Sequence, residues 1–405
     1  MGNYGDYPTC ADRHADNHTQ VLLPKRVPGR RRPLRWARPG RQWELVWDNG
    51  VWRGKRRWRG LQNHPGCTDG LIPDAGLVQA ANGDLYGTTA GINSAGTIFK
   101  ITPGGTLTTL YSFCPQTNCT DGQDPYAGLV QSADGDFYGT TYSGGANGHG
   151  TVFKITPSGT LTTLYSFCSQ GVYPNCTDGY YPRAGLVQAA NGDLYGTTPG
   201  GGPGTCSPPG CGTVFKITPS GTLTTLHSFN GTDGSAPYAG LVQATDGDLY
   251  GTTDLGGANG SNGTVFKITP SGTLTMLYSF CSQSGCTDGI NPHAGLVQDT
   301  NGDFYGTTVD GGTNNNGTLF RLSVGLGPFV KTQPPNGKVG AAVEILGTNL
   351  TGATSVSFNG TAAVFTVLSP SLITTTVPAG ASSGEVQVVT PSGTLSSHAS
   401  FRVVP

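Results

Sequence analysis

One stretch recurs through most of the chain: residues 127–167 read AGLVQSADGDFYGTTYSGGANGHGTVFKITPSGTLTTLYSF. The pentapeptide AGLVQ begins at Ala75, Ala127, Ala184, Ala239 and Ala294. A YGTT segment always starts 11 residues after that alanine, and a GT(V/I/L)F(K/R) segment comes next. Only the first four copies then add GTLT(T/M)L(Y/H)SF. A repeat that returns every 52 to 57 residues indicates propeller blades or solenoid turns.

Each copy contains four candidate strands. AGLVQA is short and apolar, and the NGD or DGD that follows suits a tight hairpin because Asn, Asp and Gly accept positive φ. DLYGTT, GTVFKIT and GTLTTLYSF are the second, third and fourth strands. Four antiparallel strands per copy predict an all-β propeller with five in-frame blades. Because the fifth copy lacks its fourth strand, we expect an incomplete ring with an exposed strand edge.

Antiparallel geometry places the connections of each copy on two sides. The short, constant turns join strands 1–2 and 3–4, whereas the long, variable loops join strands 2–3 and 4–1. Function in such folds usually lies in loops on a rigid scaffold, so we expect the loop side to bind ligand. The candidate ligand residues are Tyr126, Tyr142, Tyr173, Tyr180, Tyr181, Tyr238, Asp121, Asp178, Asp233 and Asp288. For the four aspartates, which belong to T-D-G segments, a structural Asp-Gly turn is the favoured alternative.

The cysteines follow the loops. Three pairs occupy 4–1 loops, and a fourth pair lies within one 2–3 loop; these are Cys114/Cys119, Cys168/Cys176, Cys281/Cys286 and Cys206/Cys211. The loop between the third and fourth copies lacks both cysteines together, which predicts that each pair forms a disulfide in an oxidising compartment. Zinc is the alternative, but four ligands would have to converge from separate copies. Cys67 would be left unpaired.

The first 66 residues differ in composition from the rest. They carry 14 Lys and Arg against 5 Asp and Glu, whereas residues 67–405 carry 9 against 19, and all five tryptophans lie in the first segment. A basic, Trp-rich arm can bind nucleic acid, but we do not expect a nucleic-acid partner. Synonymous codons for residues 45–50, read one base later, encode Leu-Tyr-Gly-Thr-Thr. In the same way residues 35–40 give Ala-Gly-Leu-Val-Gln, and residues 11–19 give Leu-Thr-Gly-Thr-Leu-Thr-Thr-Ile.

We therefore interpret residues 1–66 as an out-of-frame repeat and expect this segment to be disordered. The true start and any signal peptide would then lie upstream of Met1. The sequence contains no stretch of 18 apolar residues, so we expect no membrane span.

The Y-G-T-T, G-G, G-T-V-F-K-I-T-P and G-T-L-T-T-L-Y-S-F pattern of residues 67–326 resembles the GloVer tandem repeat. That resemblance implies a bacterial surface or secreted protein of the choice-of-anchor kind, with no assigned chemistry. Residues 327–405 resemble the IPT/TIG immunoglobulin-like domain, which implies a β-sandwich that serves as a spacer or adhesion module. The matching residues of this second segment are Gly340, Val343–Ile345, Gly347–Leu350, Val356–Phe358, Thr375, Val377, Pro378 and Phe401.

No HExxH, P-loop, GxSxG or zinc-ribbon pattern is present. We expect no catalytic residue, cofactor or metal. The Asp84 series in the hairpin turns and the Lys100 series on the third strands are interpreted as tight-turn residues and a solvated strand face. The sequence favours a non-catalytic, extracellular or surface binding protein whose partner is a polysaccharide or another surface protein. A polysaccharide lyase or hydrolase with an axial site and a purely structural spacer are the alternatives.

Overall fold

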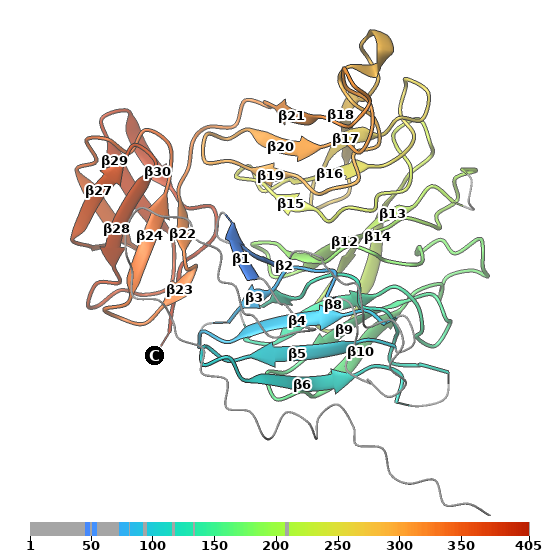
Figure 1. Cartoon of the computed structure of the whole chain (residues 1–405), viewed down its shortest axis with the longest axis horizontal. Coiled ribbons are helices and arrows are strands. Elements are labelled where there is room, and N and C mark those ends of the chain that lie inside the picture. Colours follow the sequence, from blue (N-terminus) through green and yellow to red (C-terminus); the bar gives the residue numbers. More distant parts are fainter. Residues whose placement is uncertain are drawn as a thin grey trace, which may run out of the picture. The chain divides into compact units, whose positions relative to one another are not determined.

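The computed structural model describes residues 73–80, 82–91, 95–115, 118–132, 134–206 and 210–404, and the backbone of residues 45–48 and 51–54 (Figure 1). The chain divides into two compact units, residues 1–166 and 167–405. Strands β1 (Leu45–Asp48) and β2 (Val51–Gly54) pair as an antiparallel ribbon. The rest of residues 1–66, together with Cys67, lies outside the described residues, so the predictions made for this segment stay predictions.

The first unit contains two four-stranded antiparallel sheets, and in each sheet the strands follow the order of the chain. The strands of the first sheet are β3 (Val78–Gln79), β4 (Leu85–Thr89), β5 (Thr97–Ile101) and β6 (Leu107–Ser112). Those of the second sheet are β7 (Val130–Gln131), β8 (Phe137–Thr141), β9 (Thr151–Ile155) and β10 (Leu161–Ser166). The four strands expected from each repeat are confirmed, although the first strand is only two residues long.

The second unit continues the pattern with two complete sheets and one incomplete sheet. The complete sheets are formed by β11 (Val187–Gln188), β12 (Leu194–Thr198), β13 (Thr213–Ile217) and β14 (Leu223–Ser228), and by β15 (Val242–Gln243), β16 (Leu249–Thr253), β17 (Thr264–Ile268) and β18 (Leu274–Ser279). After a 3-10 turn, η2 (Ser284–Cys286), the incomplete sheet has β19 (Val297–Gln298), β20 (Phe304–Thr307) and β21 (Leu319–Leu322). Among the described residues, the fifth sheet thus has the three strands that the sequence predicts. Four-stranded antiparallel sheets of this kind are the blades of propeller-like folds.

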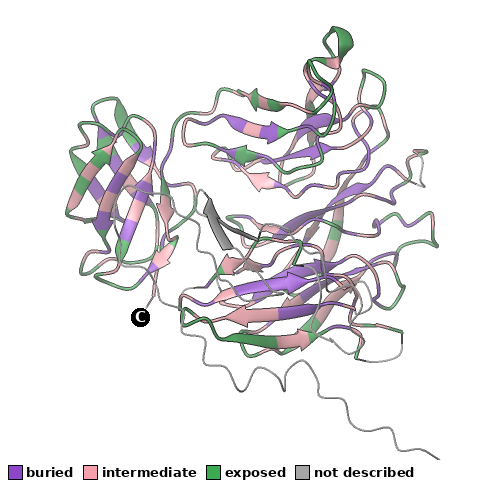
Figure 2. Cartoon of the chain, viewed as in Figure 1, coloured by how far each residue is buried: buried purple, intermediate pink, exposed green. Residues whose placement is uncertain are grey.

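Sheets of successive repeats pack face to face in each unit. In the first unit, the Tyr86 ring stacks on Phe137 of the next repeat, with ring centroids 4.1 Å apart. In the second unit, Tyr250 stacks in the same way on Phe304 at 4.3 Å. Buried residues lie along the middle strands of these sheets (Figure 2). The tyrosine of YGTT is therefore a core residue that joins one repeat to the next.

The glycine of YGTT is required by close packing. Gly139 lies opposite Phe153 of the neighbouring strand, and a Cβ built on Gly139 would come within 2.6 Å of the Phe153 ring. The equivalent glycines 87, 196, 251 and 306 meet the equivalent phenylalanines at 2.4–2.7 Å. Because real Cβ atoms do not approach other atoms this closely, only glycine leaves room for the aromatic ring at this position.

The threonines of YGTT bond in two directions. The second threonine pairs with the threonine of the third strand, as when the Oγ1 atoms of Thr141 and Thr151 lie 2.8 Å apart in a buried contact. The first threonine donates to the carbonyl oxygen of the alanine that begins the next repeat. This second contact recurs from Thr88 to Ala127, from Thr197 to Ala239 and from Thr252 to Ala294, at 2.7, 2.9 and 3.2 Å. The motif therefore serves packing and polar satisfaction together.

The C-terminal segment forms two further four-stranded sheets. Their strands are β22 (Lys331–Gln333), β24 (Ala342–Leu346), β28 (Leu372–Thr376) and β27 (Phe365–Ser369) in one sheet, and β26 (Thr361–Ala362), β25 (Ser355–Phe358), β29 (Val386–Thr390) and β30 (Gly393–Ser396) in the other. A parallel pair, β23 (Asn336–Gly337) and β31 (Arg402–Val403), completes the segment. Apolar residues of both sheets, including Ile345, Ile373, Val356, Phe358 and Val388, form one buried core. The immunoglobulin-like assignment stays a prediction.

Candidate ligand-binding surface

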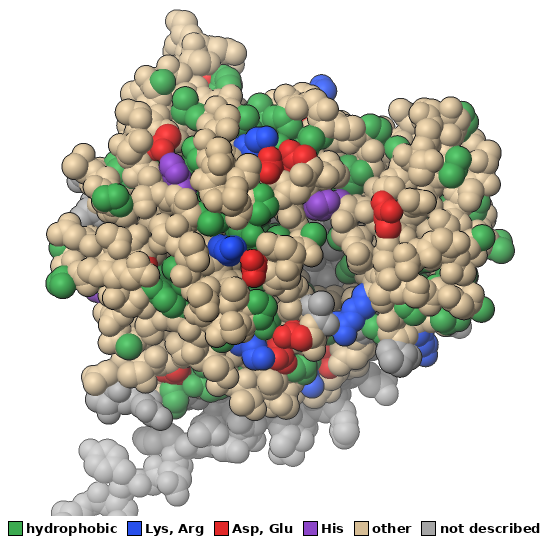
Figure 3. All heavy atoms as spheres, turned by 180° about the vertical axis from the view of Figure 1, so that it is seen from behind, with side chains coloured by type: hydrophobic (Ala, Val, Ile, Leu, Met, Phe, Trp, Pro, Cys, Tyr) green, Lys and Arg blue, Asp and Glu red, His purple; other side chains and the backbone are tan. Residues whose placement is uncertain are grey.

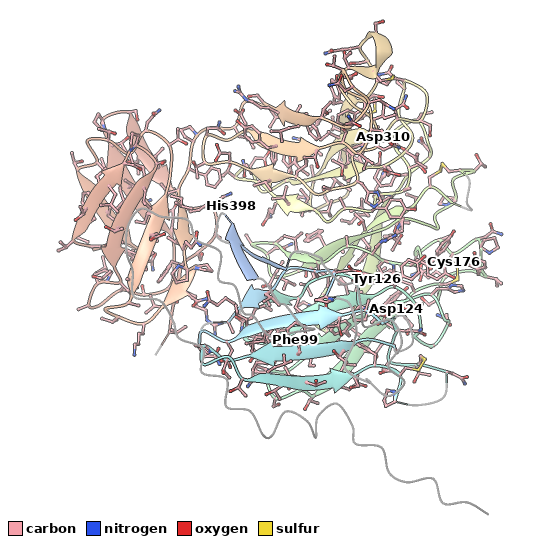
Figure 4. The ribbon with its side chains drawn as sticks, in the orientation of Figure 1. Phe99, Asp124, Tyr126, Cys176, Asp310 and His398 are labelled. Carbon is pink, nitrogen blue, oxygen red and sulfur yellow. A yellow bond between two sulfur atoms is a disulfide. The ribbon has the colours of Figure 1, made fainter. Side chains whose placement is uncertain are left out.

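The two long loops of each repeat meet on one side of its sheet. The 4–1 loop forms a β-bridge with the 2–3 loop of the same repeat at Gln123–Ser143, Tyr180–Gly200, Ser235–Leu255 and Ile290–Asp310. In the first unit, Asp124 and Tyr126 lie at the loop end of the sheet, away from Phe99 in the middle of a sheet (Figure 4). The predicted separation of a turn side and a loop side is confirmed.

A variable side chain lies at one equivalent position of every 4–1 loop, immediately after a proline and before AGLVQ. Tyr126, Arg183, Tyr238 and His293 occupy this position in four repeats. The residue before each proline has a left-handed backbone, with φ of 53–58° at Asp124, Tyr181, Ala236 and Asn291. A constant backbone conformation thus presents different chemistry from repeat to repeat, as a binding surface on a shared scaffold does.

Three of these side chains form a continuous row in the second unit. The Tyr238 ring stacks on the His293 imidazole with centroids 4.7 Å apart, and the Arg183 guanidinium lies 5.9 Å from the centroid of the same tyrosine ring. His293 Nδ1 also lies 3.3 Å from Asp254 Oδ1, on a 2–3 loop. Sequence reasoning selected Tyr238 but missed Arg183, His293 and Asp254. Their shared position after the proline could have revealed the first two.

The corresponding loops of the first unit bring Tyr126 and Tyr142 together. The two rings meet edge to face, with centroids 5.6 Å apart. Beside them, the Asp124 carboxylate accepts a hydrogen bond from Ser143 Oγ at 3.2 Å. Burial raises the pKa of Asp124, although hydrogen bonds from Ser143 and a backbone amide act in the opposite direction.

The other three candidate tyrosines form one cluster. The Tyr173, Tyr180 and Tyr181 rings lie 5.0–6.4 Å apart by their centroids. Tyr180 is buried against the Cys168–Cys176 disulfide, whereas Tyr173 is 46% exposed beside Val172, which is 81% exposed. We call Tyr173, Tyr180 and Tyr181 the tyrosine platform. The buried Tyr180 supports the exposed Tyr173 in this cluster.

The four T-D-G aspartates use their carboxylates within their own loops. Asp121 accepts from Tyr111 Oη at 2.9 Å and from the Cys114 amide, and Asp288 accepts from Tyr278 Oη at 2.7 Å and from the Ser282 amide. Burial, followed by the Asp121 hydrogen bond, raises the pKa of Tyr111 to about 12. Ligand binding by these aspartates stays a prediction, and their visible role is to close the loop that follows the fourth strand.

The other two aspartates repeat this arrangement. Asp178 is fully buried and accepts from the Ser169 amide at 2.9 Å. Asp233 belongs to the loop without cysteines; it accepts from the Asn230 amide at 2.9 Å and lies 2.8 Å from His227 Nε2. A histidine thus replaces, beside Asp233, the tyrosine found beside Asp121 and Asp288.

All four predicted disulfides are present: Cys114–Cys119, Cys168–Cys176, Cys206–Cys211 and Cys281–Cys286. No free cysteine occurs among the described residues. In the same part of the chain, no group of three or more His, Cys, Asp or Glu residues is placed to hold a metal ion. The described helical structure includes nothing long and apolar enough to cross a membrane.

A cavity lies elsewhere in the second unit, where the C-terminal segment packs on the first strands of the fourth and fifth repeats. It has a volume of about 260 Å³, and Lys331, His398, Gln243 and Gln298 are among its lining residues. Lys331 Nζ donates a hydrogen bond to the Gln298 carbonyl oxygen. Burial lowers the pKa of both Lys331 and His398. Figure 4 labels His398 in the C-terminal segment, and Figure 3 shows basic and acidic side chains interspersed on the opposite view.

Comparison with known proteins identifies the repeat. The Gloeobacter/Verrucomicrobia repeat matches residues 55–207 and 171–367. No curated protein matches this sequence. Similar solved structures include a candidate gluconolactonase (15% identity, 84% of this chain and 97% of that chain, TM-score 0.37) and a luciferin-regenerating enzyme (13%, 84% and 96%, 0.37). Xylan β-1,4-xylosidase from Bacillus halodurans C-125 is another (15%, 70% and 53%, 0.33). Likenesses at this level assign no activity to this chain.

Proposed function

This chain belongs to the Gloeobacter/Verrucomicrobia repeat family, and we propose that it is a non-catalytic extracellular or cell-surface protein that binds polysaccharide through the loop side of a β-propeller. The C-terminal segment, in this proposal, is an IPT/TIG-like immunoglobulin domain that acts as a spacer. Four disulfides in loops support an oxidising compartment, because reduced thiols are the rule in the bacterial cytoplasm.

The single observation that carries the proposal is the tyrosine platform. Tyr173 is 46% exposed on a loop that a disulfide closes, and its ring contacts the rings of Tyr180 and Tyr181. A rigid, amphipathic ring presents a large contact area at low entropic cost. The apolar face of a sugar ring can stack on such a surface while its hydroxyl groups remain hydrated.

A panel of soluble and insoluble polysaccharides, probed with the whole chain, tests the proposal. Tyr173→Ala should weaken binding to any retained polysaccharide at least tenfold, whereas Tyr173→Phe should keep most of the affinity because the ring remains. Val364→Ala is the matched control, since Val364 is 90% exposed on the C-terminal segment and remote in sequence from the loops. Equal affinities for Tyr173→Ala and the unchanged protein would contradict the placement of the site.

One observation favours a second candidate function, a lyase acting on uronate-containing polysaccharide. His293 contacts Asp254, which can orient its imidazole, and Tyr238 and Arg183 lie in the same row. His293 would take the proton from the carbon next to the uronate carboxylate. The bond to the leaving sugar oxygen would break as a carbon–carbon double bond forms, and that oxygen would take a proton from solvent water. Arg183 would neutralise the carboxylate. Ultraviolet absorbance of the unsaturated product, lost in His293→Ala, is the readout; no absorbance with any uronate polymer would exclude this activity.

A further inference from the structure

Two further loop positions change their side chains from repeat to repeat. One is the residue before the proline of the 4–1 loop, and the other is the residue that follows YGTT. In the second to fifth repeats they hold Asp124 and Tyr142, Tyr181 and Pro199, Ala236 and Asp254, and Asn291 and Val309. The carbonyl oxygen of the first residue accepts the amide of the second at 3.0 Å in Asp124–Tyr142, 3.1 Å in Ala236–Asp254 and 3.0 Å in Asn291–Val309. A shared backbone framework thus carries different chemistry in each repeat.

The second repeat combines a carboxylate with two aromatic rings at these loops. The Asp124 carbonyl oxygen also accepts the Tyr126 amide at 2.9 Å, so one residue fixes the backbone of both Tyr126 and Tyr142. The two rings are half-buried and meet edge to face, and Asp124 and Tyr126 lie at the loop end of the sheet (Figure 4). We call Asp124, Tyr126 and Tyr142 the aspartate–tyrosine cluster. No other repeat joins an acidic residue before the proline to aromatic residues at both other positions.

The Asp124 carboxylate is oriented by its neighbours and can accept further hydrogen bonds. Ser143 Oγ donates to Asp124 Oδ2 at 3.2 Å, and the Gly91 amide also donates to this carboxylate. A carboxylate has about four lone-pair sites, so hydroxyl groups of a ligand can bond to it as well. Hydrogen bonds to a charged acceptor are stronger than those between neutral groups. Asp124 can therefore hold a hydroxyl-rich ligand against the adjacent rings.

The distribution of charge in the first unit favours an uncharged ligand. Lys100 and Lys154 are the only lysine or arginine residues between residues 73 and 166, and both pair with aspartates of the hairpin turns. Burial lowers the pKa of His149, which lies on the 2–3 loop of the second repeat, so its neutral form is favoured. Within residues 73–166 the lysine charges are thus on the turn side. Asp124, on the loop side, repels a carboxylate.

We propose that the aspartate–tyrosine cluster is a second saccharide-binding site, separate from the tyrosine platform, and that it takes a neutral sugar residue. A tyrosine ring covers the apolar face of the sugar, and Asp124 accepts hydrogen bonds from neighbouring hydroxyl groups. The choice of a saccharide as ligand rests on the proposed function. The position of the site and its preference for an uncharged sugar rest on the contacts and charges of the first unit.

Saturation-transfer NMR with the whole chain tests the proposal. The protein carries Tyr173→Ala, so that the tyrosine platform does not contribute, and the probes are the methyl β-glycosides of glucose, galactose, xylose and glucuronic acid. We expect saturation transfer to at least one neutral glycoside. Tyr142→Val should remove most of this transfer, and Asp124→Asn should weaken binding about tenfold in a titration, because a hydrogen bond to a charged group is lost. Neither substitution should change the transfer to the glucuronide.

Both substitutions introduce residues that the fifth repeat has at the same positions. Asn291 has a left-handed backbone with φ of 57°, and its carbonyl oxygen accepts the Val309 amide, so the loop conformation is compatible with asparagine and valine. Equal melting temperatures of the variants and their parent would verify this. Val309→Ala is the matched control, since Val309 is 54% exposed at the equivalent position of the fifth repeat, and it should leave binding of the neutral glycosides unchanged.

Several results would overturn the second site. They are no transfer to any neutral glycoside in the Tyr173→Ala protein, unchanged transfer in Tyr142→Val, an equal loss in Val309→Ala, and a glucuronide signal that falls together with the neutral ones. Failure of the proposed platform looks different. Tyr173→Ala would then leave polysaccharide affinity unchanged, whereas Tyr142→Val would still remove the binding of neutral glycosides, which supports the second site.

Discussion

At the scale of single residues, the repeat is held together by positions that tolerate one side chain only. Gly139 faces Phe153 so closely that an added methyl group must displace the ring or the strand. Overpacking of this kind costs about 1–3 kcal/mol. Gly139→Ala should therefore lower the free energy of unfolding by about 2 kcal/mol, measured by chemical denaturation. Gly104→Ala is the control, because the nearest atom to its Cβ would be 3.8 Å away, and an equal loss in both variants would contradict the packing explanation.

We expect the Asp233–His227 contact, in the loop that lacks a disulfide, to make the stability of the protein depend on pH. Burial alone would raise the pKa of Asp233, but hydrogen bonds from His227 and the Asn230 amide hold it below its ordinary value of 3.8. A carboxyl with a lowered folded-state pKa contributes stability that is complete above its unfolded pKa and is lost as the pH falls below that value. The melting temperature of the unchanged protein should therefore fall below about pH 4.

Asp233→Asn separates this contribution from general acid unfolding. The variant should be less stable near neutral pH by ~1.5 kcal/mol, the value of a hydrogen bond to a charged group. Its melting temperature should also fall less steeply than that of the unchanged protein between pH 5 and pH 3. Parallel melting curves for the two proteins across this range would show that the Asp233–His227 contact makes no pH-dependent contribution.

Some contacts between residues could be predicted from the sequence, and others could not. The hairpin aspartates and the strand lysines were interpreted separately, yet they pair in every repeat, as in Lys154–Asp136 at 2.8 Å and Lys267–Asp248 at 2.9 Å. Both series recur once in every repeat, although the spacing between the aspartate and the basic residue changes with the length of the 2–3 loop, so their pairing could have been proposed from the strand order. The Tyr238–His293 stack could not have been proposed, because it depends on the angle between two sheets, which no spacing within one repeat encodes.

At the scale of elements, the Cys168–Cys176 loop is the one that joins stability to the proposed binding. Its disulfide packs against Tyr180, which in turn supports Tyr173. Closing a loop of this length contributes about 2.5 kcal/mol in the chain-entropy description. A Cys168→Ser/Cys176→Ser double variant should therefore melt at a lower temperature and also lose polysaccharide affinity.

The matched control for this variant is Cys281→Ser/Cys286→Ser, which removes a disulfide of similar loop length from the loop before the fifth repeat. This variant should lose stability without losing affinity. Identical binding losses in the two double variants would mean that the effect is general unfolding rather than collapse of the tyrosine platform.

The strands themselves were predictable because the chain contains the repeat pattern five times, so that turn residues can be distinguished from strand residues. The boundaries were less so: the expected AGLVQA strand pairs over only two residues, as at Val130–Gln131, because Ala127 and Gly128 approach the preceding repeat instead of a strand neighbour. The sequence selected Tyr173, Tyr180 and Tyr181 as candidate ligand residues, which they remain. It did not predict that Tyr180 is buried, because that burial depends on contact with the Cys168–Cys176 disulfide.

At the scale of the whole molecule, His398 lines the cavity between the C-terminal segment and the last repeats of the second unit, and we expect the stability of this contact to depend on pH. Burial lowers the pKa of His398 below its ordinary value of 6.5; the nearby Asp246 opposes this effect and Lys331 adds to it. The neutral imidazole is therefore favoured in the folded protein. The contribution of His398 to the free energy of unfolding is complete above about pH 6.5. It declines as the pH falls from there towards the lowered folded-state pKa, because the unfolded chain takes up the proton first.

His398→Gln should remove this contribution. Calorimetric melting of the unchanged protein should shift to lower temperature between pH 7 and pH 5, and the shift should be smaller in the variant. His149, whose pKa burial also lowers, lies in the first unit and should contribute separately. An unchanged pH dependence in His398→Gln would show that the cavity does not respond to protonation at this residue.

The bond from the first threonine of YGTT to the alanine of the next repeat has a consequence for the gene. At these three junctions one repeat carries the donor and its successor carries the acceptor, so the copies share one way of joining. Unequal recombination between homologous stretches adds or deletes whole copies without creating a mismatched junction. The number of repeats can therefore drift between related genes while every surviving junction keeps the same chemistry.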